Sequence, residues 1–278
     1  MSERILLAGC GDLGRRVAQR LLARGDEVFA LRRQLPEVDV GGIRWLRGDL
    51  ADPPSLRGLP DGVTRLVYLP APDRRDEDAY RAVFAQGPRH LLDALDTTAL
   101  RRLVFVSSSA VYGEHAGAWV DEDTPVDPPG FNGRILLDAE HWLARQAPTA
   151  VLRLAGLYGP GRTQLLERLR GGRTTAPRAV LHWANRIHVD DAAAAVVHLL
   201  DLPDAEPVYL GVDDTPLPLH VLYDHLAALL GAPAPADGPA PAGVGSKRLC
   251  NARLRASGWA PRWPDARDGY AALLDEGR

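Results

Sequence analysis

Cysteine and lysine are scarce in this sequence. Cys10 and Cys250 are its two cysteines, they lie far apart, and neither has a Cys or His beside it at metal-ligand spacing. The sequence therefore predicts no metal site and no disulfide framework. Lys247 is the single lysine of the 278 residues, although lysine and arginine together number 33. A function that needs a lysine amine at any other position is excluded.

Charge of one sign and long hydrophobic runs are also lacking. The formal net charge is -3, which gives no basic field of the kind that binds nucleic acid, so we expect no nucleic-acid partner. No apolar run reaches about 18 residues and no positively charged leader precedes an apolar stretch, so we expect no membrane partner and a cytoplasmic location. The 46% of hydrophobic residues suffices for one large core or two modest ones.

A glycine motif opens the chain. Apolar residues 4–8 are followed by Gly9-Cys10-Gly11-Asp12-Leu13-Gly14, and then by apolar residues at helical spacing. The pattern predicts a strand, a tight turn and a helix. In a dinucleotide site Gly9 permits the turn, Gly11 lets a pyrophosphate approach the backbone, and Gly14 lets the helix pack on the strand. The pyrophosphate then lies at the helix N-terminus, beside Asp12 and Leu13. A glycine turn that serves helix packing alone is the alternative.

Two arginines end the second predicted strand, residues 27–31. At this point an acidic residue binds the ribose 2'-hydroxyl of NAD, whereas arginine suits the 2'-phosphate of NADP. Arg32 and Arg33 are present and no acid is, which favours NADP over NAD as the cofactor. The alternative is that both arginines are solvated loop residues.

Strands and helices continue to alternate up to residue 154. Further strands are predicted at 43–48, 65–69, 102–106 and 150–154, with helical patterns at 76–95, interrupted by Gly87-Pro88, and at 135–146. This order is typical of an α/β fold with a Rossmann-type doubly wound parallel sheet, whose ligands bind at the carboxyl ends of the strands. The predicted cofactor residues at such ends are Asp49 and Leu50, placed to flank an adenine, together with Leu69 and Ser107.

The regular alternation weakens after residue 155. We expect a dinucleotide-binding domain at 1–155 and a smaller C-terminal α/β substrate domain at 156–278, with 186–202 returning to the first domain. Residues 232–243 alternate Ala, Pro and Gly and are predicted to form a surface loop.

Several motifs in the same order resemble the extended short-chain dehydrogenase/reductase family, the nucleotide-sugar epimerase and dehydratase group. They are the glycine turn, Gly48-Asp49-Leu50, residues 106–113 (VSSSAVYG), residues 152–161 (LRLAGLYGPG), residues 187–191 (IHVDD), and the segment from Ser246 to Trp259. The resemblance implies a Rossmann domain that binds NAD(P), a smaller domain that closes over a small-molecule substrate, often a nucleotide sugar, and a homodimer formed through two helices.

The resemblance also implies a catalytic Tyr-x-x-x-Lys pair on the helix after the long loop, and this sequence lacks it. Alignment on Gly133 and Glu140 places Asn132 at the tyrosine and Leu136 at the lysine. A shifted alignment restores nothing, because the residue four before Lys247 is a glycine. Asn132 is either part of a non-standard site or the N-cap of the helix, and we favour the N-cap.

Ser108 matches the catalytic Ser/Thr of the family, four residues before Tyr112. It either hydrogen-bonds a substrate or, with its serine neighbours, only caps the strand. Tyr112 and Tyr158 are candidate substitute acids, and Arg153, Arg162 and Arg134 are candidate contacts for substrate phosphates. His115 and His141 are candidates for a role in proton transfer, although a surface or packing role is the more common one for a lone histidine.

Two classes of function stay open. One is an NADP-dependent oxidoreductase or epimerase-like enzyme whose proton comes from another group, for example a water held by Ser108 and Asn132. The other is a catalytically inert NADP(H)-binding sensor or interaction module, which the missing Tyr and Lys favour.

Overall fold

The computed structural model describes residues 2–37 and 41–275. These residues fall into two compact units. The first unit comprises the described residues of 1–111, 130–153 and 193–209, and the second those of 112–129, 154–192 and 210–278. Each unit is described separately below.

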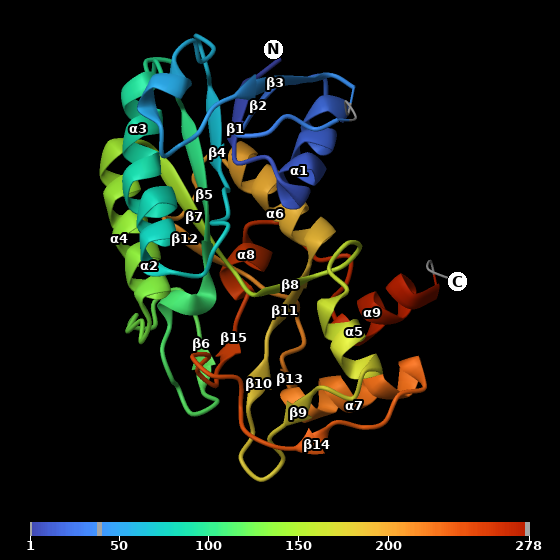
Figure 1. The fold of residues 1–278 in the computed structure, drawn as a ribbon. Coiled ribbons are helices and arrows are strands. Elements are labelled where there is room, and N and C mark those ends of the chain that lie inside the picture. The colour runs from blue at the N-terminus through green and yellow to red at the C-terminus, as the bar shows by residue number, and fades with distance from the viewer. Residues whose placement is uncertain (1, 38–40, 276–278) are drawn as a thin grey trace. The chain divides into compact units, whose positions relative to one another are not determined.

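A seven-stranded sheet organises the first unit. Its strand order is β12-β7-β5-β4-β1-β2-β3, and the pairs β1–β2, β1–β4, β2–β3 and β4–β5 are parallel (Figure 1). Because β1 is an interior strand and the chain winds outward from it to both sides, the order is that of a doubly wound Rossmann sheet, as predicted. The strands are β1 (Arg4–Ala8), β2 (Glu27–Arg32), β3 (Ile43–Arg47), β4 (Arg65–Tyr68), β5 (Arg102–Ser108), β7 (Thr149–Leu154) and β12 (Val208–Gly211).

The central strands are continuous apolar runs because helices cover both faces of such a sheet. Residues 5–8 of β1 have no exposed surface, and the middle residues of β4 and β5 are buried to the same degree. The helical elements that accompany the sheet are α1 (Asp12–Ala23), η1 (Pro53–Leu56), α2 (Glu77–Tyr80), η2 (Arg81–Gln86), α3 (Gly87–Ala94), η3 (Ser109–Val111), α4 (Phe131–Gln146) and α6 (Val189–Asp201).

The helical stretch predicted over 76–95 is divided where Gly87-Pro88 occurs. A π-helical segment, η2, ends at Gln86, and α3 then begins with Gly87 and Pro88. A proline is tolerated in the first turn of a helix, because the N–H that it lacks would have no partner within the helix. Gly87 also lets the helix approach the sheet, because a Cβ there would lie 2.5 Å from the Tyr68 hydroxyl. That hydroxyl donates a hydrogen bond to the Val83 carbonyl at 2.5 Å, which fixes η2 on β4.

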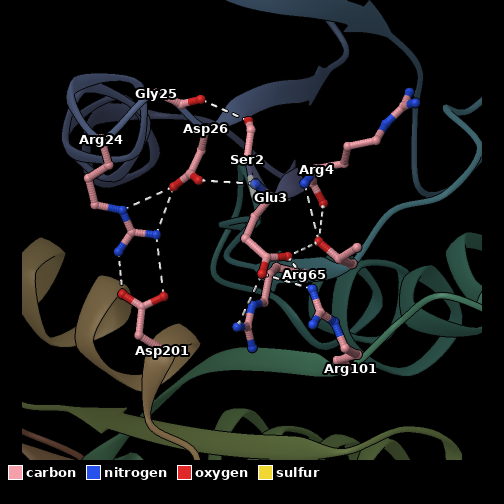
Figure 2. A network of polar contacts seen from close by, with 10 residues as sticks. Ser2, Glu3, Arg4, Arg24, Gly25, Asp26, Arg65, Arg101 and Asp201 are labelled. Carbon is pink, nitrogen blue, oxygen red and sulfur yellow. Dashed lines mark hydrogen bonds and ion pairs between the residues drawn. The ribbon is translucent and has the colours of Figure 1, made fainter.

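A polar network closes the amino-terminal edge of the sheet. Glu3 accepts hydrogen bonds from Thr64 (2.5 Å) and Arg101 (2.6 Å), which tie the start of β1 to the segments before β4 and β5 (Figure 2). Arg24, after α1, binds both Asp26 (2.7 Å) and Asp201 at the end of α6. This edge is therefore occupied by structural contacts, and the opposite, carboxyl edge is left to hold ligands.

The second unit has short strand pairs and a helical core. Leucine and tyrosine side chains of α5, α7 and α9 pack together, among them Leu166, Leu222 and Tyr270. The elements are β6 (Trp119–Val120), β8 (Gly156–Tyr158), α5 (Gln164–Arg170), β9 (Thr175–Ala176), β10 (Trp183–Ala184), β11 (Arg186–His188), β13 (Leu217–Pro218), α7 (Leu219–Leu230), β14 (Ala236–Asp237), β15 (Arg248–Leu249), α8 (Ala252–Ala256) and α9 (Ala266–Asp275).

None of the helices in the described residues combines the length and the apolar character needed to cross a membrane.

Candidate functional site

Gly9 makes a turn that only glycine fits. Its φ is +91°, and a Cβ there would lie 2.4 Å from Cα of Pro70, which follows β4. A left-handed φ and a backbone contact of that length both exclude a side chain. Hydrogen bonds from the Gly9 amide to Leu31 (3.1 Å) and from the Gly11 amide to Gly9 (2.8 Å) fix the turn.

Gly11, unlike Gly9, has free space where a side chain would lie. It is the N-cap residue of α1, with φ -81°, and a Cβ there would meet no atom within 4 Å. At Gly14 a Cβ would lie 3.1 Å from Sγ of Cys10 and 3.4 Å from Leu69, so this glycine lets α1 pack on the strands. The free space over Gly11 adjoins the amides of a helix N-terminus, which is the environment that binds a pyrophosphate. The turn therefore fits a dinucleotide.

Asp12 and Leu13 begin α1 and contribute backbone amides to this N-terminus. The side chain of Leu13 is buried, and the Asp12 carboxylate accepts a hydrogen bond from Arg16 at 3.1 Å, one turn along the helix. Neither side chain is needed for the amides to face a ligand.

Arg32 and Arg33 differ in their surroundings. Arg32 ends β2 opposite Arg47 of β3, and together with Arg15 it opposes the effect of burial, which raises the pKa of the Cys10 thiol to about 11. Arg33 instead donates from Nη2 to Oδ1 of Asp73 at 2.5 Å. An acidic group is thus present beside the arginines, although it lies 40 residues further along the chain. No local pattern in the sequence indicated it.

The other predicted cofactor residues lie at the ends of neighbouring strands. Asp49 follows β3, and its carboxylate accepts a hydrogen bond from the Ala51 amide at 2.9 Å. The carbonyl of Leu50 lies 2.7 Å from Nδ1 of His90. The Leu69 amide donates to Ala8 of β1 at 2.9 Å. With the glycine turn after β1 and Ser107 in β5, these residues lie along the carboxyl edge of β5-β4-β1-β2-β3.

Ser107 belongs to a buried polar network. Its hydroxyl donates to Glu140 of α4 at 2.5 Å, and Glu140 also binds Arg153 of β7, with an Nη2–Oε2 distance of 2.7 Å. All three residues are at most 5% exposed. Arg153 is therefore engaged inside the first unit, which corrects the expectation that it contacts substrate phosphates. The pairing of a buried arginine with Glu140 compensates two charges that could not be buried singly.

Ser108 lies at the end of β5, and its hydroxyl accepts a hydrogen bond from the Ala110 amide at 3.2 Å. This is the local contact expected of a serine that caps the strand. The accepting contact leaves the hydroxyl proton free to be donated elsewhere, so both interpretations of Ser108 stay open.

Asn132 is not the N-cap of α4. The helix begins at Phe131, four residues earlier than predicted, and Gly130 is the N-cap with φ -107° and ψ 160°. Asn132 is already helical, and its side-chain oxygen lies over Gly130, 2.6 Å from where a Cβ would be. Glycine is itself an accepted N-cap residue, so the helix has no need of Asn132 in that position. Leu136, one turn further, is 4% exposed and apolar.

The two candidate tyrosines belong to the second unit and are buried. The Tyr112 hydroxyl donates to the Asp121 carbonyl at 2.9 Å. Tyr158 stacks on Tyr270 with ring centroids 4.3 Å apart, and its hydroxyl has no hydrogen-bond partner in the described part of the chain. Burial raises the pKa of Tyr158 well above its ordinary value, so this phenol is a poor proton donor near neutral pH.

Lys247 is 4% exposed and lies in the second unit. Its ammonium group donates to the carbonyls of Tyr112 and Gly245 at 3.4 and 3.3 Å, and burial lowers its pKa. The single lysine thus anchors the segment that follows the serines. Asp191 in the His-Val-Asp-Asp segment is also structural, since it accepts hydrogen bonds from the Arg262 and Trp263 amides. Within the described residues, no group of three His, Cys, Asp or Glu side chains is arranged to hold a metal ion.

The sheet order and the glycine turn define a Rossmann-type fold, and the family match makes the protein a member of the extended short-chain dehydrogenase/reductase class. Comparison with family models makes the assignment more specific. The chain belongs to the NAD dependent epimerase/dehydratase family, whose model matches residues 5–210.

Individual relatives support this assignment. The chain is 31% identical over 243 residues to the Escherichia coli K12 protein YeeZ, a match covering 84% of this chain and 86% of YeeZ. It is 29% identical over 257 residues to a 2-alkyl-3-oxoalkanoate reductase of Stenotrophomonas maltophilia, covering 82% and 76% of the two chains. A solved protein of Methylobacillus flagellatus, grouped with NAD-dependent epimerases/dehydratases, is 37% identical with a TM-score of 0.86 over 100% of both chains.

Family membership makes the chain an NAD(P)-dependent oxidoreductase or epimerase-like protein with a nicotinamide cofactor.

Proposed function

We propose that the chain binds NADP in preference to NAD at the carboxyl edge of the first unit. The observation that carries the proposal is the open space over Gly11, between two glycines whose side-chain positions are blocked. The amides of Asp12, Leu13 and Gly14 receive the pyrophosphate, and Arg32 and Arg33 bind the 2'-phosphate. Asp49 and Leu50 flank the adenine, and Leu69 and Ser107 line the path towards the nicotinamide.

Arginine is the appropriate residue for this task, because its planar guanidinium matches a phosphate with two parallel hydrogen bonds. Arg15, Arg32 and Arg47 add positive charge at this edge, and Arg32 makes no ion pair with any residue that the structure describes. The 2'-hydroxyl of NAD carries no negative charge with which these arginines could pair.

The substrate of this proposal is a small carbonyl or hydroxyl compound, with a nucleotide sugar as one candidate. A bound nicotinamide supplies or accepts hydride. The proposed dinucleotide-binding domain is residues 1–155 and the proposed substrate domain mainly residues 156–278, with 186–202 returning to the first. In the two compact units, residues 112–129 instead group with the second unit, and the returning stretch is 193–209. Support for carbonyl chemistry comes from the name of the Stenotrophomonas relative, a 2-alkyl-3-oxoalkanoate reductase.

Ser108 and Asn132 are the residues of this chain proposed to act on the substrate. The Ser108 hydroxyl has a proton to donate, and the Asn132 amide provides both donors and an acceptor. Neither exchanges a proton at neutral pH, so the two residues orient the substrate and hold the water that carries the proton. Leu136 makes the neighbouring position apolar, in place of a cation.

The same apolar side chain favours the second candidate, a redox-inert NADP(H) sensor or interaction module. A buried Leu136 cannot stabilise a phenolate, and no phenol stands at Asn132. The two candidates share the cofactor and differ only in turnover.

Thermal shift measurements with NADP and with NAD test the preferential binding of NADP, which both candidate functions require. A ligand that binds only the folded state raises stability by RT ln(1 + [L]/Kd), so NADP is expected to raise Tm more than NAD at equal concentration. A larger shift with NAD would contradict the proposal.

Single-turnover mixing separates the two candidates. Stoichiometric oxidation of NADPH by any member of a panel of carbonyl compounds and nucleotide sugars establishes the enzyme. The inert module predicts no oxidation with any of them, although NADPH is bound.

A further inference from the structure

The ion pair between Arg33 and Asp73 joins two segments on either side of the glycine turn. Arg33 directly follows β2, and Asp73 lies on the segment after β4. In the sheet β1 lies between these two strands, and the glycine turn extends from its carboxyl end. The pair therefore connects the neighbours of the strand that carries the proposed pyrophosphate site.

The spacing of strands sets how far this connection reaches. Adjacent strands lie about 4.8 Å apart, so β2 and β4 are separated by about 10 Å across β1. The segment after β4 is held close to the turn at its second residue, because Pro70 occupies the space where a Gly9 side chain would lie. Asp73 follows three residues later and reaches Arg33 from that side. The two side chains thus bridge the carboxyl end of β1.

The bridge is an exposed ion pair. The side chains of Arg33 and Asp73 are 52% and 64% exposed, and pairs of this kind contribute little net stability. The pair nevertheless stabilises the charged form of both groups. The hydrogen bond from Arg33 lowers the pKa of Asp73, and the same hydrogen bond raises the pKa of Arg33. Arg33 is therefore neutralised by a partner that a stronger anion can displace.

We propose that Arg33 and Asp73 form a latch that a 2'-phosphate opens, Arg33 exchanging the carboxylate of Asp73 for the phosphate. The proposal rests on the proposed binding of NADP. A phosphate monoester carries nearly two negative charges and three acceptor oxygens, so it competes for the guanidinium better than a single exposed carboxylate. NAD has no such group and leaves the latch closed.

Asp73 is then a specificity-determining residue that lowers the affinity for NADP relative to NAD. It competes with the 2'-phosphate for Arg33, so it weakens NADP binding and leaves NAD binding unaffected. Arg32, which has no such partner among the described residues, gives the basal preference for NADP. The ratio of the NADP and NAD affinities therefore depends on Asp73, after β4, as well as on Arg32 and Arg33 at the end of β2.

A double-mutant cycle tests the latch. The dissociation constants of NADP and NAD are measured by isothermal titration calorimetry for the wild type, Asp73→Asn, Arg33→Gln and the double variant. Both residues are exposed, so the variants are expected to fold, and circular dichroism melting curves check this. Asp93→Asn is the control, because Asp93 is exposed on α3 and its substitution removes the same charge elsewhere in the first unit.

The latch predicts that Asp73→Asn tightens NADP binding about threefold to tenfold and changes NAD binding less than about twofold. In the Arg33→Gln background the effect of Asp73→Asn on NADP disappears, and Asp93→Asn changes neither constant.

Two results overturn the latch. One is an unchanged NADP constant in Asp73→Asn, and the other is an effect of equal size in the Arg33→Gln background, which indicates direct repulsion between Asp73 and the ligand. Equal dissociation constants of the wild type for NADP and NAD would contradict the proposed preference for NADP. In that case the double-mutant cycle, measured on the NADP dissociation constant, still tests the latch. If neither dinucleotide binds, both proposals fail.

Discussion

Gly9 and Gly11 stand two residues apart and meet opposite steric demands. The first has a left-handed φ of +91° and no room for a Cβ, whereas the second has φ -81° and open space in the direction of a side chain. Folding alone explains Gly9. It does not explain Gly11, whose free space is the property that a ligand requires.

Alanine substitution at each position separates folding from binding. Gly9→Ala is expected to destabilise the protein strongly, since a left-handed alanine costs about 1–2 kcal/mol before the contact with Pro70 is added. Gly11→Ala is expected to keep a Tm near that of the wild type and to lose most of the increase in Tm caused by NADP. Thermal melts with and without NADP measure both effects. Undiminished stabilisation of Gly11→Ala by NADP would place the pyrophosphate elsewhere.

Asp213 gives the second unit a pH dependence of stability. It is 2% exposed, and burial raises the pKa of its carboxyl to about 8, with further contributions from Asp265 and Asp214 and opposition from the Thr215 amide and Arg186. An unfolded aspartate has a pKa of about 3.9. The folded state therefore binds a proton that the unfolded state releases between these two values, and stability falls as the pH rises through that window.

Asp213→Asn is expected to remove this slope. Urea unfolding at pH of about 5 and about 9 should show the wild type losing stability relative to the variant at the higher pH. A constant difference between the two proteins across this range would contradict the raised pKa of Asp213.

At the scale of elements, the carboxyl edge depends on how β5, α4 and β7 are joined. Ser107, Glu140 and Arg153 connect these three elements through buried hydrogen bonds. Ser108 and Asn132 lie on two of them, so the network also sets the positions of the proposed substrate contacts.

Glu140→Gln is expected to destabilise the protein by about 3–5 kcal/mol, because it leaves the Arg153 guanidinium buried without a counter-charge. The control is Glu77→Gln, which breaks an exposed pair with Arg81 and should cost less than about 1 kcal/mol. Urea unfolding of both variants measures the difference. Similar small losses in the two variants would indicate that the buried pair is not needed for stability.

The elements themselves were largely predictable, and the contacts between them were not. Strands β1, β4 and β5 each contain a continuous apolar run after an initial arginine, and the burial of these runs on both faces leaves that signal in the sequence. The start of α4 lies before the predicted helix of 135–146, and its N-cap is Gly130, which is a weaker local signal than Asn132. The pairing of Arg33 with Asp73 and of Arg153 with Glu140 depends on segments that the fold brings together, so no local pattern could indicate either pair.

At the scale of the whole molecule, family membership and the absence of the usual catalytic pair lead to different conclusions. The family model indicates a nicotinamide dinucleotide, and the glycine turn leaves open space at Gly11 for its pyrophosphate. We propose that Asn132 and Leu136 stand at the positions where the family resemblance implies Tyr and Lys, and the single lysine, Lys247, has no tyrosine four residues before it. Binding of the dinucleotide therefore follows from family membership, whereas turnover depends on which residues replace the catalytic pair.

Calorimetric titration of the wild-type protein with NADP and with NAD tests cofactor binding most directly. We expect one equivalent of NADP to bind, with a dissociation constant about tenfold or more below that of NAD, because guanidinium groups pair with the 2'-phosphate. Tighter binding of NAD, or no binding of either dinucleotide, would contradict this expectation.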